Sequence, residues 1–220
     1  AHADGIRAVA IVMMHAWAHP AHELRLGEIA RAEGFSQVSL SHQASPLPRI
    51  VPRGDTTVVD AYLSPVLRRY TDQLAASLPA TGRLAFMQSN GGLAEVGAFR
   101  GKDAILSGPA GGVVGMVAAC EPLGHSRLIG FDMGGTSTDV AHYAGKVELT
   151  GDSVVAGVRV AAPMMQIHTV AAGGGSICRF DGARFRVGPE SAGADPGPAC
   201  YRKGGPLTVT DCNLFLGRID

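Results

Sequence analysis

Short apolar runs alternate with amphipathic stretches in the first part of the chain, which indicates strands separated by helices. Residues 6–14 form a short, apolar and β-branched run, and this pattern predicts a buried strand. Pro20 and the polar residues after it predict a helix that ends near Glu33. A second short strand is predicted at residues 37–40. The chain therefore opens with the predicted order of strand, helix and strand.

Prolines interrupt this pattern in the next segment. Three prolines between residues 45 and 54 predict extended, irregular chain, and we place a domain boundary near Arg53. A helix should follow, capped by Asp55 or Thr56, because apolar residues recur there at helical spacing. Pro65 lies inside this pattern, so we expect the helix to kink there or to split in two.

The second half of the chain is predicted to be rich in strands. One further helix is predicted at residues 107–120. An Asp-Gly pair at 181–182 suits a type I′ turn and predicts a hairpin. A loop rich in glycine and proline is expected at 188–205, and Thr210 or Asp211 should cap a short last helix. The strands are expected at residues 83–88, 128–132, 138–143, 147–150, 154–161, 164–170, 177–180 and 183–187.

The composition is that of a soluble globular chain, with 46% hydrophobic and 17% charged residues among 220. Because 19 Lys and Arg balance 19 Asp and Glu, a nucleic-acid partner is not expected. The longest uninterrupted apolar run, residues 8–14, is far too short for a membrane span, and no secretory leader is recognisable, so we expect a cytoplasmic protein. The 4 cysteines include no CxxC pair, which argues against a disulfide framework or a structural zinc site.

The most distinctive chemistry lies at residues 129–140, where an apolar strand is followed by glycines, hydroxyl residues and aspartates. Glycines at the tip of a tight turn expose backbone N–H groups to an anion, and hydroxyl groups add donors. An aspartate beside such a cradle can hold hydrated Mg²⁺ against phosphate oxygens. The alternative is a plain hairpin turn with solvated hydroxyls. The candidate phosphate-binding residues are Gly134, Gly135, Thr136, Ser137 and Thr138, and the flanking carboxylates are Asp132 and Asp139.

Two other glycine-rich segments allow both a functional and a structural interpretation. Gly173, Gly174 and Gly175 follow a predicted strand, where they could lie along nucleotide or substrate or could simply form a tight connection. Residues 107–115 place glycines at a helix start, which suits an anion or close packing of helix against sheet.

Several single residues also leave alternatives open. Glu190 and Asp195 are metal or substrate ligands, or solvated acids of a loop. His168 is a catalytic residue or a hydrogen-bonded histidine at a strand end. Cys200 is not expected to be a nucleophile, because nothing near it in the sequence lowers its thiol pKa. The three histidines between residues 15 and 22 have metal-like spacing, but a proline interrupts the helix that would align them.

Five long sequence words carry a resemblance to a known family. They read RIVPRG at 49–54, SGPAGGVVG at 107–115, DMGGTSTDV at 132–140, TVAAGGGS at 169–176 and GPESAGADPGPACY at 188–201. Together they resemble the hydantoinase A/oxoprolinase family, most of all its ATP-dependent oxoprolinases. The third word also resembles the second phosphate loop of the actin/hexokinase/heat-shock-chaperone ATPase superfamily. The similarity runs along essentially the whole chain.

The resemblance implies an α/β fold of the actin-like ATPase type, with RNase-H-like subdomains whose mixed sheets are flanked by helices. Residues 1–53 would end the first subdomain, and residues 54–220 would form part of the second, with the phosphate loop at 132–139. Family members begin with a first phosphate loop, and no such word precedes Asp132. We therefore expect a middle segment of the A-type half that is inactive by itself.

The resemblance further implies an enzyme that uses ATP and Mg²⁺ to open 5-oxo-L-proline to L-glutamate, releasing ADP and phosphate. Asp132 would then hold Mg²⁺ through water, while Asp139 would support the loop or polarise a nucleophile; both are the implied catalytic residues. Alternatives are a hydantoin or N-methylhydantoin hydrolase, an acetone carboxylase subunit, and a non-catalytic nucleotide-binding module. The expected partners are the cyclic amide substrate, a B-type half or subunit, and further copies of the same chain.

Overall fold

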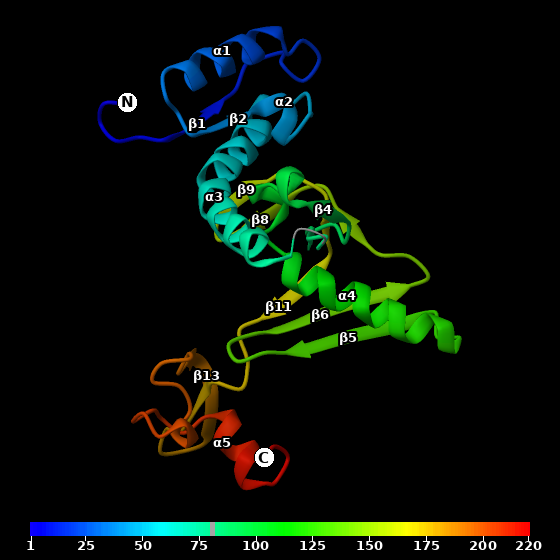
Figure 1. The fold of residues 1–220 in the computed structure, drawn as a ribbon. Coiled ribbons are helices and arrows are strands. Elements are labelled where there is room, and N and C mark those ends of the chain that lie inside the picture. Colours follow the sequence, from blue (N-terminus) through cyan, green and yellow to red (C-terminus); the bar gives the residue numbers. More distant parts are fainter. Residues whose placement is uncertain (80–81) are drawn as a thin grey trace. The chain divides into compact units, whose positions relative to one another are not determined.

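The chain forms small sheets with flanking helices, and these elements gather into two units (Figure 1). The computed structural model describes residues 1–79 and 82–220. The prediction of an α/β chain with helices flanking its sheets is confirmed. Among the described residues one small sheet is parallel and the others are antiparallel, so no single sheet is mixed. The assignment of residues 1–53 and 54–220 to two RNase-H-like subdomains stays a prediction. Unit 1 comprises Ala1–Val114 and Glu148–Met165, and unit 2 comprises Gly115–Val147 and Gln166–Asp220.

Unit 1 opens with the predicted strand, helix and strand. β1 (Ala8–Ile11) pairs in parallel with β2 (Gln37–Leu40), and α1 (Ala21–Ala32) connects them. Parallel neighbours need a crossover of this kind, because the end of one strand lies far from the start of the next. α2 (Ser41–Ala44) follows β2 directly.

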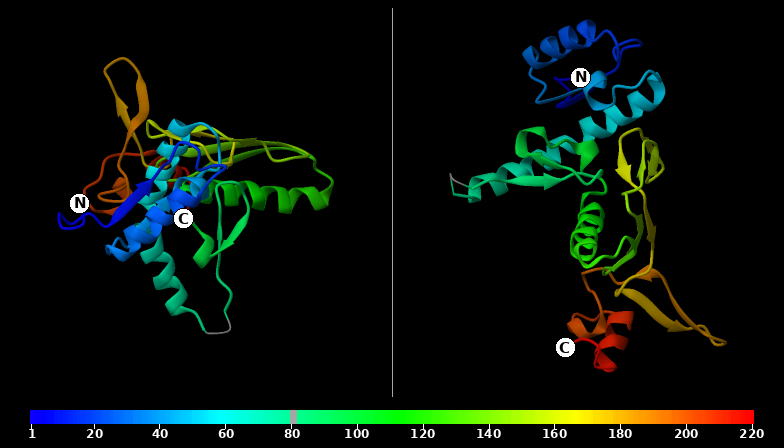
Figure 2. Two further views of the ribbon diagram at one scale, coloured as in Figure 1. Left: turned by 90° about the horizontal axis from the view of Figure 1, so that it is seen from above. Right: turned by 90° about the vertical axis from the view of Figure 1, so that its right-hand side faces the viewer.

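α3 (Ile50–Ser77) starts earlier than the proline pattern predicts. The expectation of extended chain up to residue 54 is wrong from Ile50 onward. Pro52 occupies the first helical turn, where a missing N–H removes no helical hydrogen bond. Arg53 therefore lies inside the helix, fully buried. The helix also continues through Pro65 without splitting, as the views in Figure 2 show.

Short strand pairs complete unit 1. The predicted single strand over residues 154–161 is instead a hairpin, because Ala156 (φ 50°) and Gly157 (φ 81°) form a turn in its middle. The antiparallel pairs are β3 (Ala85–Met87) with β4 (Leu93–Glu95), β7 (Leu149–Thr150) with β10 (Met164–Met165), and β8 (Ser153–Val155) with β9 (Val158–Val160). Two 3-10 turns, η1 (Val96–Ala98) and η2 (Gly101–Asp103), follow β4.

α3 packs against β1, β2 and β9. Val160, Ala162 and Met164 form the buried core of unit 1, and Val59 of α3 packs against them. Thr56 ties this region to the helix, because its Oγ1 accepts a hydrogen bond of 2.7 Å from the amide of residue 161.

Unit 2 is built on a three-stranded antiparallel sheet in the order β11–β6–β5. The predicted helix over residues 107–120 is confirmed as α4 (Ser107–Cys120), which runs from unit 1 into unit 2 and is followed by η3 (Glu121–Leu123). Met116 of α4 contacts Gly130, where an added Cβ would lie 3.0 Å from the Met116 Sδ. The strands of the sheet are β5 (Arg127–Met133), β6 (Thr138–Ala144) and β11 (Ile167–Val170).

The Asp-Gly hairpin is confirmed as β12 (Ser176–Phe180) paired with β13 (Phe185–Ser191), with Gly182 at φ +96° in its turn. β13 continues through the first residues of the loop expected at 188–205. η4 (Ala199–Tyr201) and α5 (Val209–Phe215) complete the unit. The cap of α5 is Thr208, two residues before the earlier of the two expected caps. No helix among the described residues is both long and apolar enough to cross a membrane.

Candidate functional site

The predicted phosphate loop connects β5 to β6 in unit 2. Asp132, near the end of β5, pairs across the sheet with Asp139, near the start of β6. Residues 134–137 form the turn between them, and the amide of Gly134 closes it by donating a hydrogen bond of 2.8 Å to the carbonyl of Ser137. The sequence word therefore folds as a tight hairpin with one aspartate on each strand.

The tip of this hairpin carries hydrogen-bond donors that the protein itself does not use. Across the described residues, the amides of Gly135, Thr136 and Ser137 donate no hydrogen bond, and neither do the hydroxyls of Thr136 and Ser137. An added Cβ at Gly135 would meet no atom of residues 1–79 and 82–220 within 4 Å, so the space beside it is open. Clustered backbone donors beside open space suit an anion such as a phosphate group.

The second glycine segment lies directly against this turn. The amide of Gly174 donates to the carbonyl of Gly134 at 2.9 Å, and the amide of Gly175 donates to the carbonyl of Gly135 at 2.6 Å. A Cβ at Gly173 would stand 2.7 Å from the Gly134 carbonyl oxygen, closer than real Cβ contacts. The structure thus brings the two glycine words together backbone to backbone, as a tight connection requires. That the triplet also contacts nucleotide stays a prediction.

Two threonine hydroxyls hold the strands next to the turn. Thr138 is buried, and its hydroxyl donates to the carbonyl of Ala172 at 2.6 Å. Thr169 of β11 lies opposite Asp139 and donates to its Oδ1 at 2.6 Å. The hydroxyl proton of Thr138 is therefore engaged within the protein, whereas the hydroxyls at the tip are free to meet a ligand.

The paired carboxylates fit a divalent cation. Direct cross-strand partners project from the same face of a sheet, so the side chains of Asp132 and Asp139 are neighbours. Like charges in this arrangement destabilise the strand pair, and a bound cation removes the repulsion. Mg²⁺ is held by one or two carboxylates together with phosphate oxygens and water, which matches a carboxylate pair beside an anion cradle.

The start of α5 supports the glycine segment from the other side. Thr210 donates to the carbonyl of Gly174 through its amide at 2.8 Å and through its hydroxyl at 2.9 Å. Asp211 fixes this helix start, since its carboxylate accepts hydrogen bonds from both the amide and the hydroxyl of Thr208 in a capping box. The turn at 134–137 is therefore held through the glycine triplet by a capped helix.

Asp211 also affects the protonation of the Cys200 thiol. Burial acts to raise the pKa of Asp211, but hydrogen bonds from Cys200 and Thr208 outweigh it and hold that pKa at about 2. The hydrogen bond to Asp211, together with burial, raises the pKa of the Cys200 thiol. A raised pKa disfavours the nucleophilic thiolate, in line with the sequence interpretation.

The side chains of the remaining candidates take no part in the contacts described above. His168 precedes by one residue the partner of Asp139 on β11, so its side chain projects from the opposite face of the sheet. Glu190 forms an exposed ion pair of 3.1 Å with Arg179, and Asp195 is exposed. Among the described residues no group of three or more His, Cys, Asp or Glu side chains is placed to hold a metal ion.

Sequence reasoning missed a buried polar network in unit 1. Glu23 is fully buried and accepts hydrogen bonds from the hydroxyl of Ser41 at 2.5 Å, Nδ1 of His42 at 2.7 Å and the amide of Met13 at 2.8 Å. Arg53, also fully buried, donates to Ser41 Oγ at 2.9 Å and to four backbone carbonyls. Burial acts to raise the pKa of Glu23, but the donors around it outweigh burial and lower it. No local motif predicts these partners, because they come from three helices and two loops that are separate in the sequence.

Comparison with known proteins shows similarity along the residues that contain these motifs. The family model for "Hydantoinase/oxoprolinase" matches residues 53–220. The chain is 51% identical to the 5-oxoprolinase of Saccharomyces cerevisiae, with 99% of this chain and 17% of that protein aligned. It is 42% identical to the caprolactamase subunit alpha of Pseudomonas jessenii, with 96% of this chain and 32% of the relative aligned. The chain therefore spans only about a sixth of the curated oxoprolinases and about a third of the caprolactamase subunit.

Solved structures agree with this assignment. The whole chain aligns with 33% of the crystal structure of the ATP-dependent caprolactamase from Pseudomonas jessenii, at a TM-score of 0.74 and 38% identity. The whole chain also aligns with 32% of a nucleotide-free structure of acetone carboxylase, at a TM-score of 0.80 and 27% identity. On these matches and on the motifs described above, the chain belongs to the hydantoinase/oxoprolinase family.

Proposed function

We propose that this chain supplies the phosphate-binding part of an enzyme that opens 5-oxo-L-proline to L-glutamate at the expense of ATP. The observation that carries the proposal is the hairpin tip at residues 134–137, whose unused amides lie between Asp132 and Asp139. Identity of 51% to a yeast 5-oxoprolinase and of 42% to a caprolactamase subunit supports a cyclic amide as the substrate.

The chemistry explains why ATP is needed. Resonance makes a lactam carbonyl a poor electrophile, and transfer of the γ-phosphoryl group to the lactam oxygen would activate it. Water then adds to the activated carbon, the ring C–N bond breaks and the amine takes a proton. A second water releases phosphate from the resulting acyl phosphate, which leaves glutamate, ADP and phosphate.

The protein's part in such a phosphoryl transfer is positioning and charge stabilisation. The amides of Gly135, Thr136 and Ser137 would bind phosphate oxygens, aided by the two hydroxyls at the tip. Asp132, the exposed carboxylate, would hold Mg²⁺ through water, and Asp139 would keep its place through Thr169. Bound Mg²⁺ supplies neutralisation of the charge that gathers on the phosphates.

Two alternatives use the same site. The first alternative is a different substrate, namely another cyclic amide, a hydantoin or a ketone; similarity to caprolactamase and to acetone carboxylase fits another cyclic amide or a ketone. A module that binds nucleotide without catalysis would keep the hairpin tip and lose the need for a substrate. A B-type half or subunit is the expected partner, because this chain spans a fraction of its relatives.

One assay separates these possibilities. A protein of the relatives' full length that carries this sequence, together with its B-type half, is supplied with Mg-ATP and one substrate at a time. Phosphate release that depends on 5-oxo-L-proline supports the proposal, and release that depends on caprolactam, hydantoin or acetone assigns the substrate accordingly. Nucleotide binding without release under any of these conditions would indicate the non-catalytic module.

A further inference from the structure

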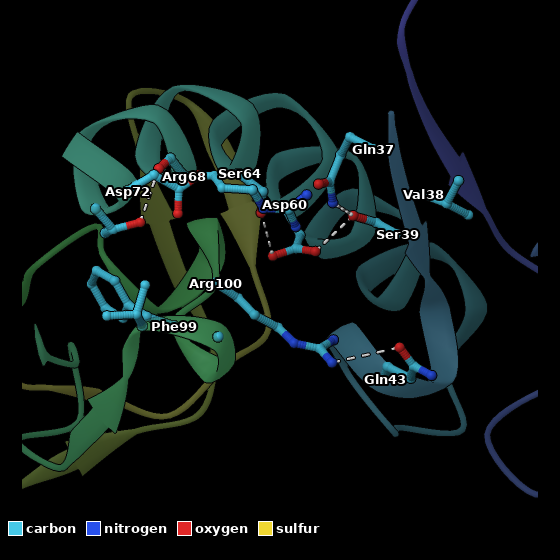
Figure 3. Close-up of a pocket in the computed structure, with 13 residues that line it drawn as sticks. Gln37, Val38, Ser39, Gln43, Asp60, Ser64, Arg68, Asp72, Phe99 and Arg100 are labelled. Carbon is cyan, nitrogen blue, oxygen red and sulfur yellow. Dashed lines mark hydrogen bonds between the residues drawn. The ribbon is translucent and has the colours of Figure 1, made fainter. Parts of the chain in front are cut away.

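Unit 1 contains a polar pocket with a volume of about 340 Å³ (Figure 3). β2 supplies Gln37 and Ser39 to its wall, α3 supplies Asp60 and Ser64, and Arg100 comes from the segment between η1 and η2. None of these residues belongs to the sequence words that carried the proposed function. The proposed function therefore leaves the role of this pocket unexplained.

A chain of hydrogen bonds fixes the orientation of Gln37. An ionised aspartate only accepts, so the hydroxyl of Ser39 donates to Asp60 Oδ2, at 2.7 Å. Ser39 Oγ is then left to accept from Gln37 Nε2, at 3.0 Å. The amide nitrogen must face Ser39, and Gln37 Oε1 therefore faces the other way. In Figure 3 these side chains lie next to one another along the pocket wall.

Gln37 Oε1 is a buried acceptor without a donor. The side chain is 7% exposed, and its Oε1 is the buried side-chain atom that lacks a hydrogen-bond partner within the described part of the chain. Buried polar atoms almost always have a partner, so an orphan that lines a pocket points to a ligand donor. Asp60 does not compete for that donor, because its other oxygen is already within reach of the Ser64 hydroxyl, at 3.2 Å.

The opposite wall offers positive charge. Within the described chain, the Arg100 side chain makes one hydrogen bond, a long one of 3.5 Å from Nη2 to Gln43 Oε1. Most of the donors on its guanidinium group are therefore open to a ligand. Arg68 and Asp72 of α3 also line the pocket. Arginine binds carboxylates with two parallel hydrogen bonds, which gives both strength and orientation.

We propose that this pocket binds a small carboxylate that also carries an amide N–H. Gln37 Oε1 accepts from the N–H, Arg100 binds the carboxylate, and Ser39 and Asp60 hold Gln37 in place. This inference rests on the proposed function for the choice of ligand: 5-oxo-L-proline carries a ring N–H and a carboxylate on a ring small enough for this volume. The pocket thereby becomes the site that recognises the amide substrate.

Three probes separate the two contacts. 5-Oxo-L-proline has both groups, its lactone analogue replaces the N–H by a ring oxygen, and 2-pyrrolidinone lacks the carboxylate. Dissociation constants are measured by calorimetry on the full-length protein, independently of turnover. We expect the lactone and pyrrolidinone each to bind at least about tenfold more weakly than 5-oxo-L-proline, the loss expected for one hydrogen bond to a buried or charged group.

Matched substitutions on the protein test the same contacts. Gln37→Met removes the acceptor at similar volume and should abolish the preference for lactam over lactone. Arg100→Gln should abolish the preference for the carboxylate. Gln73→Met and Arg69→Gln alter exposed residues of α3 that do not line the pocket, and both should keep the full selectivity of the unaltered protein. The KM for ATP should stay unchanged in all four variants.

The outcomes distinguish the pocket from the proposed function. If the unaltered protein binds 5-oxo-L-proline and Arg100→Gln retains the same selectivity as Arg69→Gln, the pocket assignment is overturned while the function stands. If the unaltered protein binds none of the three probes, the pocket does not recognise this class of ligand, whatever the turnover. Because Arg100 is partly exposed, its variant stays informative even if Gln37→Met fails to fold.

Discussion

A Cβ on Gly173 would stand 2.7 Å from the carbonyl oxygen of Gly134, so the glycine triplet and the phosphate loop meet through their backbones. This approach allows the triplet amides to donate to the loop carbonyls. The loop amides then point away from the triplet and find no partner among the residues that the structure describes. The capacity of the loop to bind an anion thus depends on a segment that follows another strand of the sheet.

Gly173→Ala tests that dependence. The added methyl group forces backbone away from backbone, so we expect a loss of about 1–3 kcal/mol in the free energy of unfolding and weaker Mg-ATP binding. Gly115→Ala is the control, because a Cβ there meets no atom of the described structure within 4 Å and alanine favours the α4 helix. Denaturant titration and calorimetry measure both effects. Equal behaviour of the two variants would mean that the contact does not shape the loop.

Thr136→Val and Thr138→Val should separate binding from stability. The buried Thr138 hydroxyl donates to a backbone carbonyl, so its removal leaves that carbonyl unpaired and should cost about 1–3 kcal/mol of stability. The Thr136 hydroxyl is exposed, so its removal should leave stability unchanged and raise the KM for ATP severalfold. A stability loss confined to Thr136→Val would contradict the description of the loop.

The lowered pKa of Asp211 predicts that its contribution to the stability of the fold is lost at low pH. Its folded pKa of about 2 lies below the ordinary 3.8, so its contribution is fully present above pH 3.8 and is lost as the pH falls through about 2. Asp211→Asn should cost about 1 kcal/mol at neutral pH, as the loss of a cap does. Its stability should also vary less than that of the unaltered protein between pH 4 and pH 2. If the stability of Asp211→Asn and that of the unaltered protein changed equally with pH, this role of Asp211 would be excluded.

Arg53→Lys addresses the buried network of unit 1. Lysine cannot reproduce the fork of donors that reaches Ser41 Oγ and four carbonyls, and several of these acceptors would lose their partner. We expect a loss of about 3 kcal/mol in the free energy of unfolding. Arg49→Lys, one turn earlier and largely exposed, should change stability by less than about 0.5 kcal/mol. A similar cost for both variants would show that the network does not stabilise α3.

The hairpins and the helix starts were predictable from the sequence where local chemistry decides them. Asp181-Gly182 forms the turn between β12 and β13, and the helix beginning at Ser107 starts where predicted. The glycines around Asp132 also form the expected turn between two strands. These features depend on backbone preferences of neighbouring residues, which a single sequence displays directly.

Features that depend on distant partners were not predictable. Ile50–Gly54 is helical because Arg53 finds its acceptors on other elements, a gain that outweighs the irregular tendency of the prolines. In the sequence Gln37 is an ordinary residue of a predicted strand, and only the contacts of Ser39 with Gln37 and Asp60 in the fold determine its orientation. The meeting of Gly173 with Gly134 likewise follows from the pairing of β11 with β6, which no motif in either segment specifies.

In the proposed function, the turn at 134–137 binds ATP phosphates, and Asp132 holds the Mg²⁺. The most direct measurement is phosphate release by the Asp132→Asn variant of the full-length protein, with its B-type half, 5-oxo-L-proline and saturating Mg²⁺. We predict turnover at least about a hundredfold slower than in the unaltered enzyme, since a metal-holding carboxylate acts on the transition state. Thermal stability should not fall and should rise slightly, because the substitution removes the like-charge repulsion between the exposed Asp132 and Asp139. Asp152→Asn, at an exposed ion pair in unit 1, should turn over normally. Near-normal turnover of a folded Asp132→Asn variant would contradict the account.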